Sequence, residues 1–429
     1  MSFPRYPIYK ASGVEWLGEV PEHWAVKRLR FVANLNPSKS EISDLHRGTA
    51  VSFLPMESVG DDGVLALDKT KSIAELETGY TYFREGDVTI AKITPCYENG
   101  KGALMLGLTN GIGFGTTELI VARPIPSQIT GTYLHYLFIS PDFRGIGESH
   151  MYGAGGQKRV PDAFVRNFAT AIPPLAEQTA IAAFLDHETA KIDELVAEQE
   201  RLIDLLKEKR QAVISHAVTK GLNPDAPMKD SGIEWLGEVP VGWAVLKLKY
   251  LCKVQTGDKD TENAVESGQY PFFVRSQTVE RINSMAFDCE AVLTAGDGVG
   301  VGKVFHYHKG PFDFHQRVYM MHDFQKVSGP FFFHYLRENF FKVALEGGAK
   351  STVDSLRRPM FMNFPVCVPS VSEQSTIVTL IESETAKFDI LTTEANRVID
   401  LLKERRTALI SAAVTGQIDV RNAVILEVA

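Results

Sequence analysis

The sequence has few cysteines and no long apolar run. Its four cysteines lie far apart, form no C-x-x-C pair, and fit neither a disulfide framework nor a four-ligand zinc pattern: Cys96, Cys252, Cys289 and Cys367. No stretch of 18 apolar residues occurs, and the N-terminal residues contain no apolar core of a signal peptide. We therefore expect a cytoplasmic protein that neither spans a membrane nor is exported.

An excess of positive charge is also missing. The 429 residues include 45 Lys and Arg against 53 Asp and Glu, a net charge of −8. This excludes a chain that binds nucleic acid over its whole surface, so any site for a polyanion has to be local. The hydrophobic fraction of 44% is that of an ordinary globular protein, and the length corresponds to roughly three folding units.

Motifs for catalysis are absent as well. Residues 298–304 (GVGVGKV) superficially resemble a P-loop, but Asp297 replaces the required glycine and Val304 stands where Ser or Thr binds magnesium. No Asn/Asp-Pro-Pro-aromatic run for amine methylation is present. Three histidines and an aspartate in a β-rich segment could be imagined as a metal cluster, but no general-acid partner is evident: His306, His308, Asp313 and His315. We predict no catalytic residue, no cofactor and no metal.

What the sequence does contain is a tandem repeat. Residues 13–21 (GVEWLGEVP) return as residues 232–240 (GIEWLGEVP), 219 positions later, and a tryptophan follows each copy. The segment that begins at Ile172 (IPPLAEQTAIAAFLDHETAKIDEL) returns at Val368 (VPSVSEQSTIVTLIESETAKFDIL), 196 positions later. The repeats are similar at their edges and different in between, which indicates a constant frame around variable contents.

The second repeated segment has the pattern of a long amphipathic helix. Apolar residues recur at helical spacing over residues 177–218: Leu185, Ile192, Leu195, Leu202, Leu206 and Val213. Prolines precede each copy and a glycine follows it. Such a helix would be about 60 Å long, although residues 186–189 could cap a first helix and begin a second. Two single-stripe helices most simply pair with each other; alternatively, each covers its own domain.

These observations predict an α+β protein with two mixed α/β domains in tandem, separated by two long helices that pair as an antiparallel coiled coil. The expected domains are residues 1–171 and 222–367, and the expected helices lie in 172–221 and in 368–429, the latter with a C-terminal tail. Short β-rich runs such as 86–93 and 317–324 alternate with turns in both domains. A shared His-Tyr-Leu at 135–137 and 334–336 indicates one fold used twice.

The duplicated motifs resemble the specificity subunit of type I restriction-modification enzymes. They are WLGEVP with its following Trp, P-x-x-x-EQ-x-x-I, ETAK-x-D and LLKE-[KR]-R-x-A-[LV]-IS-x-AVT. The resemblance implies two target-recognition domains that each read one half of a bipartite target in double-stranded DNA. It also implies a non-catalytic scaffold for two methyltransferase (modification) subunits and for restriction/translocase subunits. A free-standing two-headed DNA-binding protein or regulator is the alternative, and an enzyme of unfamiliar pattern is a third possibility.

Reading DNA requires donors to phosphates and to base edges, usually on loops held by a rigid scaffold. In the first domain such residues stand beside glycine-containing turns: Lys92, Thr94, Tyr97, Asn99, Lys101, Gln157, Lys158 and Arg159. In the second domain the candidates are Arg275, Ser276, Gln277, Lys303, His315, Gln316, Arg317, Lys350, Ser351, Arg357 and Arg358. The parallel between GAGGQKRV in the first domain and GGAKSTV in the second favours a matching role for these two glycine-basic loops.

Overall fold

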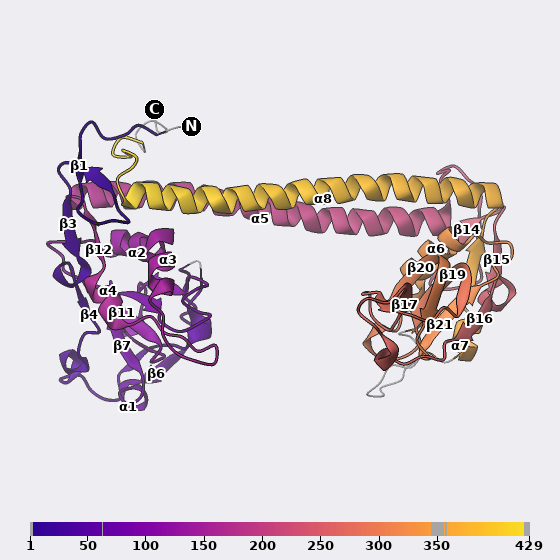
Figure 1. The fold of residues 1–429 in the computed structure, drawn as a ribbon, viewed down its shortest axis with the longest axis horizontal. Helices are drawn as coiled ribbons and strands as arrows, with labels where there is room; N and C mark the ends of the chain where they lie inside the picture. The colour runs from indigo at the N-terminus through magenta and orange to yellow at the C-terminus, as the bar shows by residue number, and fades with distance from the viewer. Residues whose placement is uncertain (1–2, 62, 345–355, 357, 424–429) are drawn as a thin grey trace. The chain divides into compact units, whose positions relative to one another are not determined.

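The computed structural model describes residues 3–61, 63–344, 356 and 358–423. The chain divides into two compact units (Figure 1). Unit 1 comprises residues 1–198 and 398–429, and unit 2 comprises residues 199–397. The two longest helices each contribute one part to unit 1 and the other part to unit 2.

Unit 1 is built from short strands and short helices. Its strands are β1 (Tyr9–Ala11), β2 (Glu19–Pro21), β3 (Ala25–Arg28), β4 (Ala33–Leu35), β5 (Ala50–Leu54), β6 (Thr70–Ser72), β7 (Thr81–Arg84), β8 (Val88–Ala91), β9 (Gly102–Leu104), β10 (Ile112–Gly115), β11 (Leu119–Pro124) and β12 (Ala169–Ile172). Its short helices are α1 (Ile73–Leu76), α2 (Gly131–Ile139), α3 (Pro141–Ser149) and α4 (Asp162–Asn167). Two four-stranded sheets, ordered β6-β5-β10-β7 and β4-β11-β8-β9, form its β-rich part.

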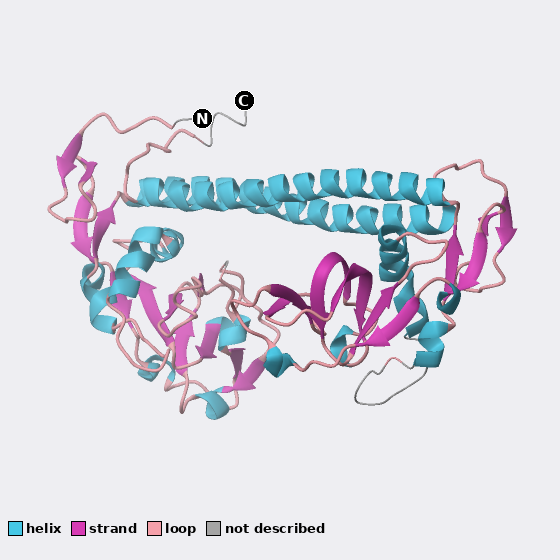
Figure 2. Ribbon diagram, turned by 45° about the vertical axis from the view of Figure 1, so that its right-hand side comes forward, coloured by secondary structure: helices cyan, strands magenta, loops and turns pink. Residues whose placement is uncertain are grey.

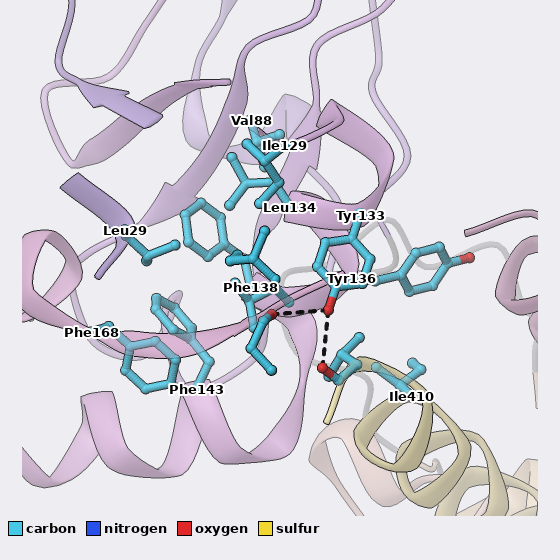
Figure 3. Close-up of a cluster of buried hydrophobic side chains, with 14 of the residues drawn as sticks. Leu29, Val88, Ile129, Tyr133, Leu134, Tyr136, Phe138, Phe143, Phe168 and Ile410 are labelled. Carbon is cyan, nitrogen blue, oxygen red and sulfur yellow. Dashed lines mark hydrogen bonds between the residues drawn. The ribbon is translucent and has the colours of Figure 1, made fainter. Parts of the chain in front are cut away.

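The main core of unit 1 lies where α2 meets the sheets and the long C-terminal helix. Tyr133 and Phe138 of α2 are almost completely buried, and Figure 3 shows them with Ile410 of that C-terminal helix close by. The Tyr133 hydroxyl donates to the backbone oxygens of Ala171 and Val414, at 3.2 and 3.0 Å. Because burial without a partner would be costly for a hydroxyl, these bonds fix α2 against both β12 and the helix.

Unit 2 has one large sheet. Its strands are β13 (Met228–Asp230), β14 (Glu238–Pro240), β15 (Ala244–Lys247), β16 (Lys253–Thr256), β17 (Tyr270–Phe273), β18 (Glu280–Ile282), β19 (Phe287–Ala295), β20 (Phe305–Phe314), β21 (Val318–His322) and β22 (Pro365–Val368); its short helices are α6 (Gly329–Ala344) and α7 (Arg358–Met362). Six strands run in the order β16-β21-β19-β20-β17-β18. Phe331 and Tyr335 of α6 pack into the same core as Val292 of β19. These strands and helices are coloured by type in Figure 2.

In both units an antiparallel strand pair closes the variable segment. β3 pairs with β12, with Arg28 opposite Ala169, and β15 pairs with β22, with Lys247 opposite Pro365. The chain therefore leaves the repeated frame and returns to it at neighbouring positions. Variable segments of different sequence can therefore be carried on the same strand pair.

The two long helices are α5 (Leu175–Lys220) and α8 (Val371–Val414), and both are continuous. No break occurs at residues 186–189, because the Thr189 hydroxyl donates to the Leu185 carbonyl inside the helix rather than capping a new one. Gly221 and Gly416, just beyond the two helix ends, have φ values of +78° and +76°. Only glycine adopts this conformation without strain, and it terminates helices for that reason.

The helices lie side by side and run in opposite directions, as Figures 1 and 2 show. In unit 1 Arg405 lies 3.8 Å from Glu188 and Arg406 lies 3.2 Å from Asp193. In unit 2 Arg210 is paired with Asp389. The predicted fold class is thus confirmed, and the alternative in which each helix merely covers its own domain is wrong.

The expected apolar stripe is buried only in part. Ile192 and Leu206 of α5 are buried, whereas Leu195 and Leu202 are 45% and 41% exposed. A pair of helices buries a seam narrower than the full apolar face, because each helix has a single neighbour here. Part of that face therefore remains at the surface.

Candidate nucleic-acid interface

The glycine-rich loop of unit 1 is a closed turn between two paired residues. Tyr152 and Arg159 exchange backbone hydrogen bonds of 3.1 and 2.8 Å. Within the loop, Gly153 has a φ of +135°, and a Cβ there would lie 2.6 Å from the Gln157 carbonyl oxygen. A side chain at position 153 would therefore disrupt the turn. The turn leaves Gln157 and Lys158 exposed at its tip.

Thr94 braces this loop from a neighbouring segment. Its hydroxyl donates to the Gly156 carbonyl at 2.6 Å and accepts from the Lys158 amide at 3.0 Å. The Thr94 amide also donates to the Lys158 carbonyl at 3.0 Å. Lys92 adds a further tie, because its carbonyl accepts from the Val160 amide. The structure thus brings Lys92 and Thr94 together with the glycine loop, and it uses the Thr94 hydroxyl for support.

Arg159 is held by a carboxylate that sequence analysis did not identify. Its Nε and Nη2 groups donate to the two carboxylate oxygens of Glu118 at 3.0 and 2.7 Å. The hydrogen bond from Arg159 lowers the pKa of Glu118. The Arg159 side chain is 38% exposed, and its Nη1 group takes no part in the pair. Glu118 therefore fixes the orientation of Arg159 without covering it.

The turn at Tyr97 differs from the prediction. Tyr97 is completely buried, and its hydroxyl donates to the Phe143 carbonyl at 3.1 Å. Burial raises the pKa of Tyr97 well above its ordinary value. A side chain in this position packs the core and does not contact a ligand at the surface. The expectation that Tyr97 touches DNA is therefore corrected: this residue fixes a turn in which Asn99 is exposed.

Two cations hold the same turn from inside. Lys101 donates from Nζ to the carbonyls of Met56 and Val59, at 3.1 and 2.9 Å. Arg144 donates to three carbonyl oxygens, those of Tyr97, Phe138 and Gly100. Burial lowers the pKa of Arg144 to about 10. Sequence analysis missed Arg144, and nothing in the local pattern of its helix signals this role.

In unit 2 two predicted arginines converge on one acidic side chain. Arg275 and Arg317 donate from Nη1 to the two oxygens of Asp297, at 2.9 and 2.8 Å. Gln277 donates from Nε2 to the Lys303 carbonyl at 3.1 Å. The structure therefore assembles the 275–277 segment, Lys303 and Arg317 into one exposed cluster, with Ser276 among them. The sequence alone indicated for Asp297 only that it replaces the glycine that a P-loop requires.

His315 lies beneath this cluster, which corrects its expected exposure. The residue is 1% exposed, and its Nδ1 accepts from the Arg317 amide at 2.9 Å. Burial lowers the pKa of His315, which favours the neutral ring that such an acceptor requires. Its neighbour Gln316 is exposed and donates to Asp260 at 2.6 Å. His315 thus orders the turn rather than facing outward.

Of the remaining candidates, Arg358 is exposed and donates to the Val254 carbonyl at 3.3 Å. Lys350, Ser351 and Arg357 fall outside the described residues. The comparison of the two glycine-basic loops therefore stays a prediction.

The histidine-rich strand segment does not assemble a metal site in the part of the chain that the structure describes. Asp313, for example, accepts a hydrogen bond of 2.6 Å from Ser284. Among the described residues, no helix is both long enough and apolar enough to cross a membrane.

The duplicated frame carries a different cluster of polar loop residues in each unit. Residues 240–399 match the family model described as the type I restriction modification DNA specificity domain. Over these residues the chain is thus similar to the DNA specificity domain of type I restriction-modification systems.

Two curated relatives are similar to part of the chain. The chain is 42% identical over 201 residues to the type I restriction enzyme EcoAI specificity subunit of Escherichia coli, and 40% identical over 200 residues to the EcoEI specificity subunit of the same species. In both comparisons the match covers 46% of this chain and 33% of the relative. The matched part thus spans about a third of the length of these relatives.

Two solved structures have a similar fold. A chain from a study of complex assembly and conformational transition in the type I restriction-modification system aligns with a TM-score of 0.74 at 18% identity. The HsdS subunit of Thermoanaerobacter tengcongensis aligns with a TM-score of 0.57 at 16% identity. Each alignment covers 92% of this chain and 98% of the other.

Proposed function

We propose that this chain is the DNA-reading subunit of a type I restriction-modification complex. Residues 1–171 and 222–367 would act as target-recognition domains, each reading one half of a bipartite sequence in double-stranded DNA. The observation that carries this proposal is the repeated base, β3 with β12 and β15 with β22, around loop surfaces of different composition. A constant strand pair that carries different loop surfaces suits a protein that recognises two unlike half-sites.

The polar loop residues supply the chemistry that such reading needs. Base edges are read by amide, hydroxyl and guanidinium donors, and phosphates attract ammonium groups. Exposed residues of these kinds are proposed as contacts: Asn99, Gln157, Lys158, Arg275, Ser276, Gln277, Lys303, Gln316, Arg317 and Arg358. Lys92 and Arg159 are half-buried contributors, and Lys350, Ser351 and Arg357 are proposed from the sequence alone. Thr94, Tyr97, Lys101 and His315 act by holding the loops.

The same proposal assigns the partners. The chain would carry no catalytic activity and would hold two adenine-methyltransferase (modification) subunits together with restriction/translocase subunits in the cytoplasm. Apolar side chains that the helix pair leaves uncovered support a scaffold role. On α5 these include Leu202 and Leu205, and on α8 they include Ile390 and Leu401, each more than 40% exposed. A contiguous exposed patch of apolar side chains commonly marks a protein interface.

The test is the methylated sequence itself. Methylome sequencing of cells with and without the chain should reveal one bipartite adenine-methylated motif that depends on it. A chimera in which residues 29–168 come from a relative should change one half of that motif and keep the other, because β3 and β12 close the exchanged segment. If cells without the chain keep every methylated motif, the proposal is contradicted. It is also contradicted if the chimera changes both halves of the motif.

A further inference from the structure

The loop at residues 296–303, which resembles a P-loop only superficially, packs against the backbones of two arginines, Arg275 and Arg317. The Gly296 amide donates to the Arg317 carbonyl at 2.8 Å. A Cβ on Gly296 would lie 2.9 Å from that same oxygen, and a Cβ on Gly300 would lie 2.6 Å from the Arg275 carbonyl oxygen. Real Cβ atoms do not approach this closely, so the glycines are there because the loop packs directly on both arginine backbones.

Asp297 connects the two arginine side chains from below. Its Oδ1 accepts from Arg275 at 2.9 Å and its Oδ2 from Arg317 at 2.8 Å. The Asp297 side chain is 16% exposed, against 41% and 59% for the two arginines. Burial alone would raise the pKa of Asp297, but the two hydrogen bonds outweigh it and the pKa lies below its ordinary value. The carboxylate is therefore charged, and the guanidinium groups stand outside it.

Each arginine keeps one bidentate edge for a ligand. Asp297 engages Nη1 of both, and among the described residues neither guanidinium has another hydrogen-bond partner. The Nε and Nη2 donors remain, and this pair matches the O6 and N7 acceptors of guanine in the major groove. In unit 1, by contrast, Glu118 occupies Nε and Nη2 of Arg159.

The carboxylate distinguishes base reading from phosphate binding. A negative charge between two arginines weakens their attraction for phosphate, which depends on local charge. The carboxylate also fixes the orientation of the guanidinium groups, because a guanidinium that is already held loses less conformational freedom when it binds a DNA base. The cluster thus suits geometric readout more than general affinity.

We propose that Asp297 is a positioning residue that holds Arg275 and Arg317 as a pair of guanine readers. This inference rests on the proposed function and deepens it: the half-site read by unit 2 contains guanine at the positions that the two arginines reach. Arg275 follows β17 and Arg317 precedes β21, so the two readers come from separate strands and address separate positions.

The experiment uses the chain assembled with its modification subunits. Arg275→Lys and Arg317→Lys keep the charge and remove the planar fork, while Asp297→Asn keeps the shape but cannot accept from both arginines. Asp323→Asn is the matched control, because it removes an acid from another ion pair of this unit, Lys253 with Asp323 at 2.7 Å, beyond the opposite end of β21. Each complex is titrated with cognate duplexes, with duplexes substituted at each guanine of the unit 2 half-site, and with scrambled duplexes.

Each lysine variant should lose roughly 5- to 150-fold of its preference for guanine at one position only. Asp297→Asn should weaken guanine preference at one or both of these positions, yet bind scrambled duplex at least as tightly as wild type, because a negative charge has been removed. Loss of specific binding with a gain in non-specific binding is not what misfolding produces. Asp323→Asn should retain the wild-type preference.

Several outcomes would overturn the inference. Asp297→Asn with wild-type guanine preference, or lysine variants that discriminate as wild type does, would remove the cluster from base reading. If Asp297→Asn fails to fold, the two lysine variants on exposed side chains still decide. Equal losses on cognate and scrambled duplexes would assign the arginines to phosphates instead. A wild-type complex without any sequence preference would contradict the proposed function itself, before any variant is compared.

Discussion

Trp24 donates from its indole nitrogen to the Glu177 carboxylate at 3.1 Å, and in the second repeat Trp243 donates to Glu373 at 3.0 Å. Trp24 and Glu177 are 153 residues apart in the chain. They belong to the two motifs that the sequence repeats, WLGEVP with its tryptophan and the EQ pair that opens each long helix. The two repeated motifs therefore contact each other, and this structural joint between the tryptophan and the start of the long helix occurs once in each unit.

The glutamine of each EQ pair completes this joint. Gln178 accepts from the Thr130 amide at 2.8 Å and donates to the carbonyls of Gln128 and Pro173, both at 2.9 Å. Gln374 makes the same three kinds of bond in unit 2, with Ser328, Lys326 and Pro369. Both side chains are completely buried. A buried amide with three of its hydrogen bonds made orders the loop that precedes α2 or α6.

Gln178→Ala should therefore destabilise the protein by about 2–4 kcal/mol, because it leaves an amide and two carbonyls without partners. Urea unfolding of the wild type and the variant measures this difference. Gln211→Ala, an exposed glutamine on the same helix, is the control and should change stability by less than about 0.5 kcal/mol. Equal effects at the two positions would show that the buried bonds do not stabilise the unit.

Stability should also fall as the pH drops below neutrality. Burial lowers the pKa of both His135 and His334 to about 4, and nearby arginines add to the effect. The unfolded chain takes up these protons near pH 6.5, while the folded chain does not. Each histidine thus costs stability as the pH falls from about 6.5 toward 4, roughly 1 kcal/mol between pH 7.5 and 5.5.

The double variant His135→Gln and His334→Gln checks this directly. It removes both protonation sites, so the difference in unfolding free energy between pH 7.5 and 5.5 should shrink relative to wild type. His216→Gln, an exposed histidine of α5, should leave that difference as it is. A pH dependence that the double variant shares with wild type would rule these histidines out as its cause.

The long helices could be predicted from sequence because their signal is local. Apolar spacing, the prolines before and the glycines after each helix lie within one segment, and the duplication repeats them. The possible break at 186–189 does not occur, since the Thr189 hydroxyl bonds to the Leu185 carbonyl within the helix and the helix has no end there to cap. The number of exposed leucines was beyond prediction, because it depends on how many neighbours a helix has.

The interior of the loop clusters could not be read in the same way. Tyr97 is buried because α3, more than 40 residues later, supplies the carbonyl that accepts its hydroxyl. Arg159 meets Glu118 across 41 residues, and Asp297 meets Arg275 across 22. A polar side chain beside a glycine is the same pattern whether it supports a loop or protrudes from it, so only the tertiary partner distinguishes the two roles.

Lys158 should contribute to affinity without contributing to specificity. It is exposed at the tip of the glycine loop, whereas Arg159 is already paired with Glu118. In the assembled complex, Lys158→Ala should weaken cognate and scrambled duplexes alike and reduce the log-log salt slope by about 0.9, the value for one lost phosphate contact. Lys207→Ala, an exposed lysine of α5, is the control. An unchanged slope would remove Lys158 from the DNA interface.

Lengthening the helix pair should change the spacer between the two half-sites. Arg210 pairs with Asp389, so a point after Leu206 in α5 corresponds to a point after Thr392 in α8. Seven residues inserted at both points keep the apolar seam nearly in phase, with a drift of about 20°, and add about 10 Å of helix. At 3.4 Å per base pair this equals about three base pairs.

The measurement is the methylated motif of cells that carry the lengthened chain. The two half-site sequences should stay the same, since neither loop cluster has been altered, and the unspecified spacer between them should lengthen by about three base pairs. The same seven residues inserted into α5 alone serve as the control; they shift the register of Arg210 against Asp389 and should abolish methylation rather than move it. An active double insertion with an unchanged spacer would show that the helices do not determine the distance between the half-sites.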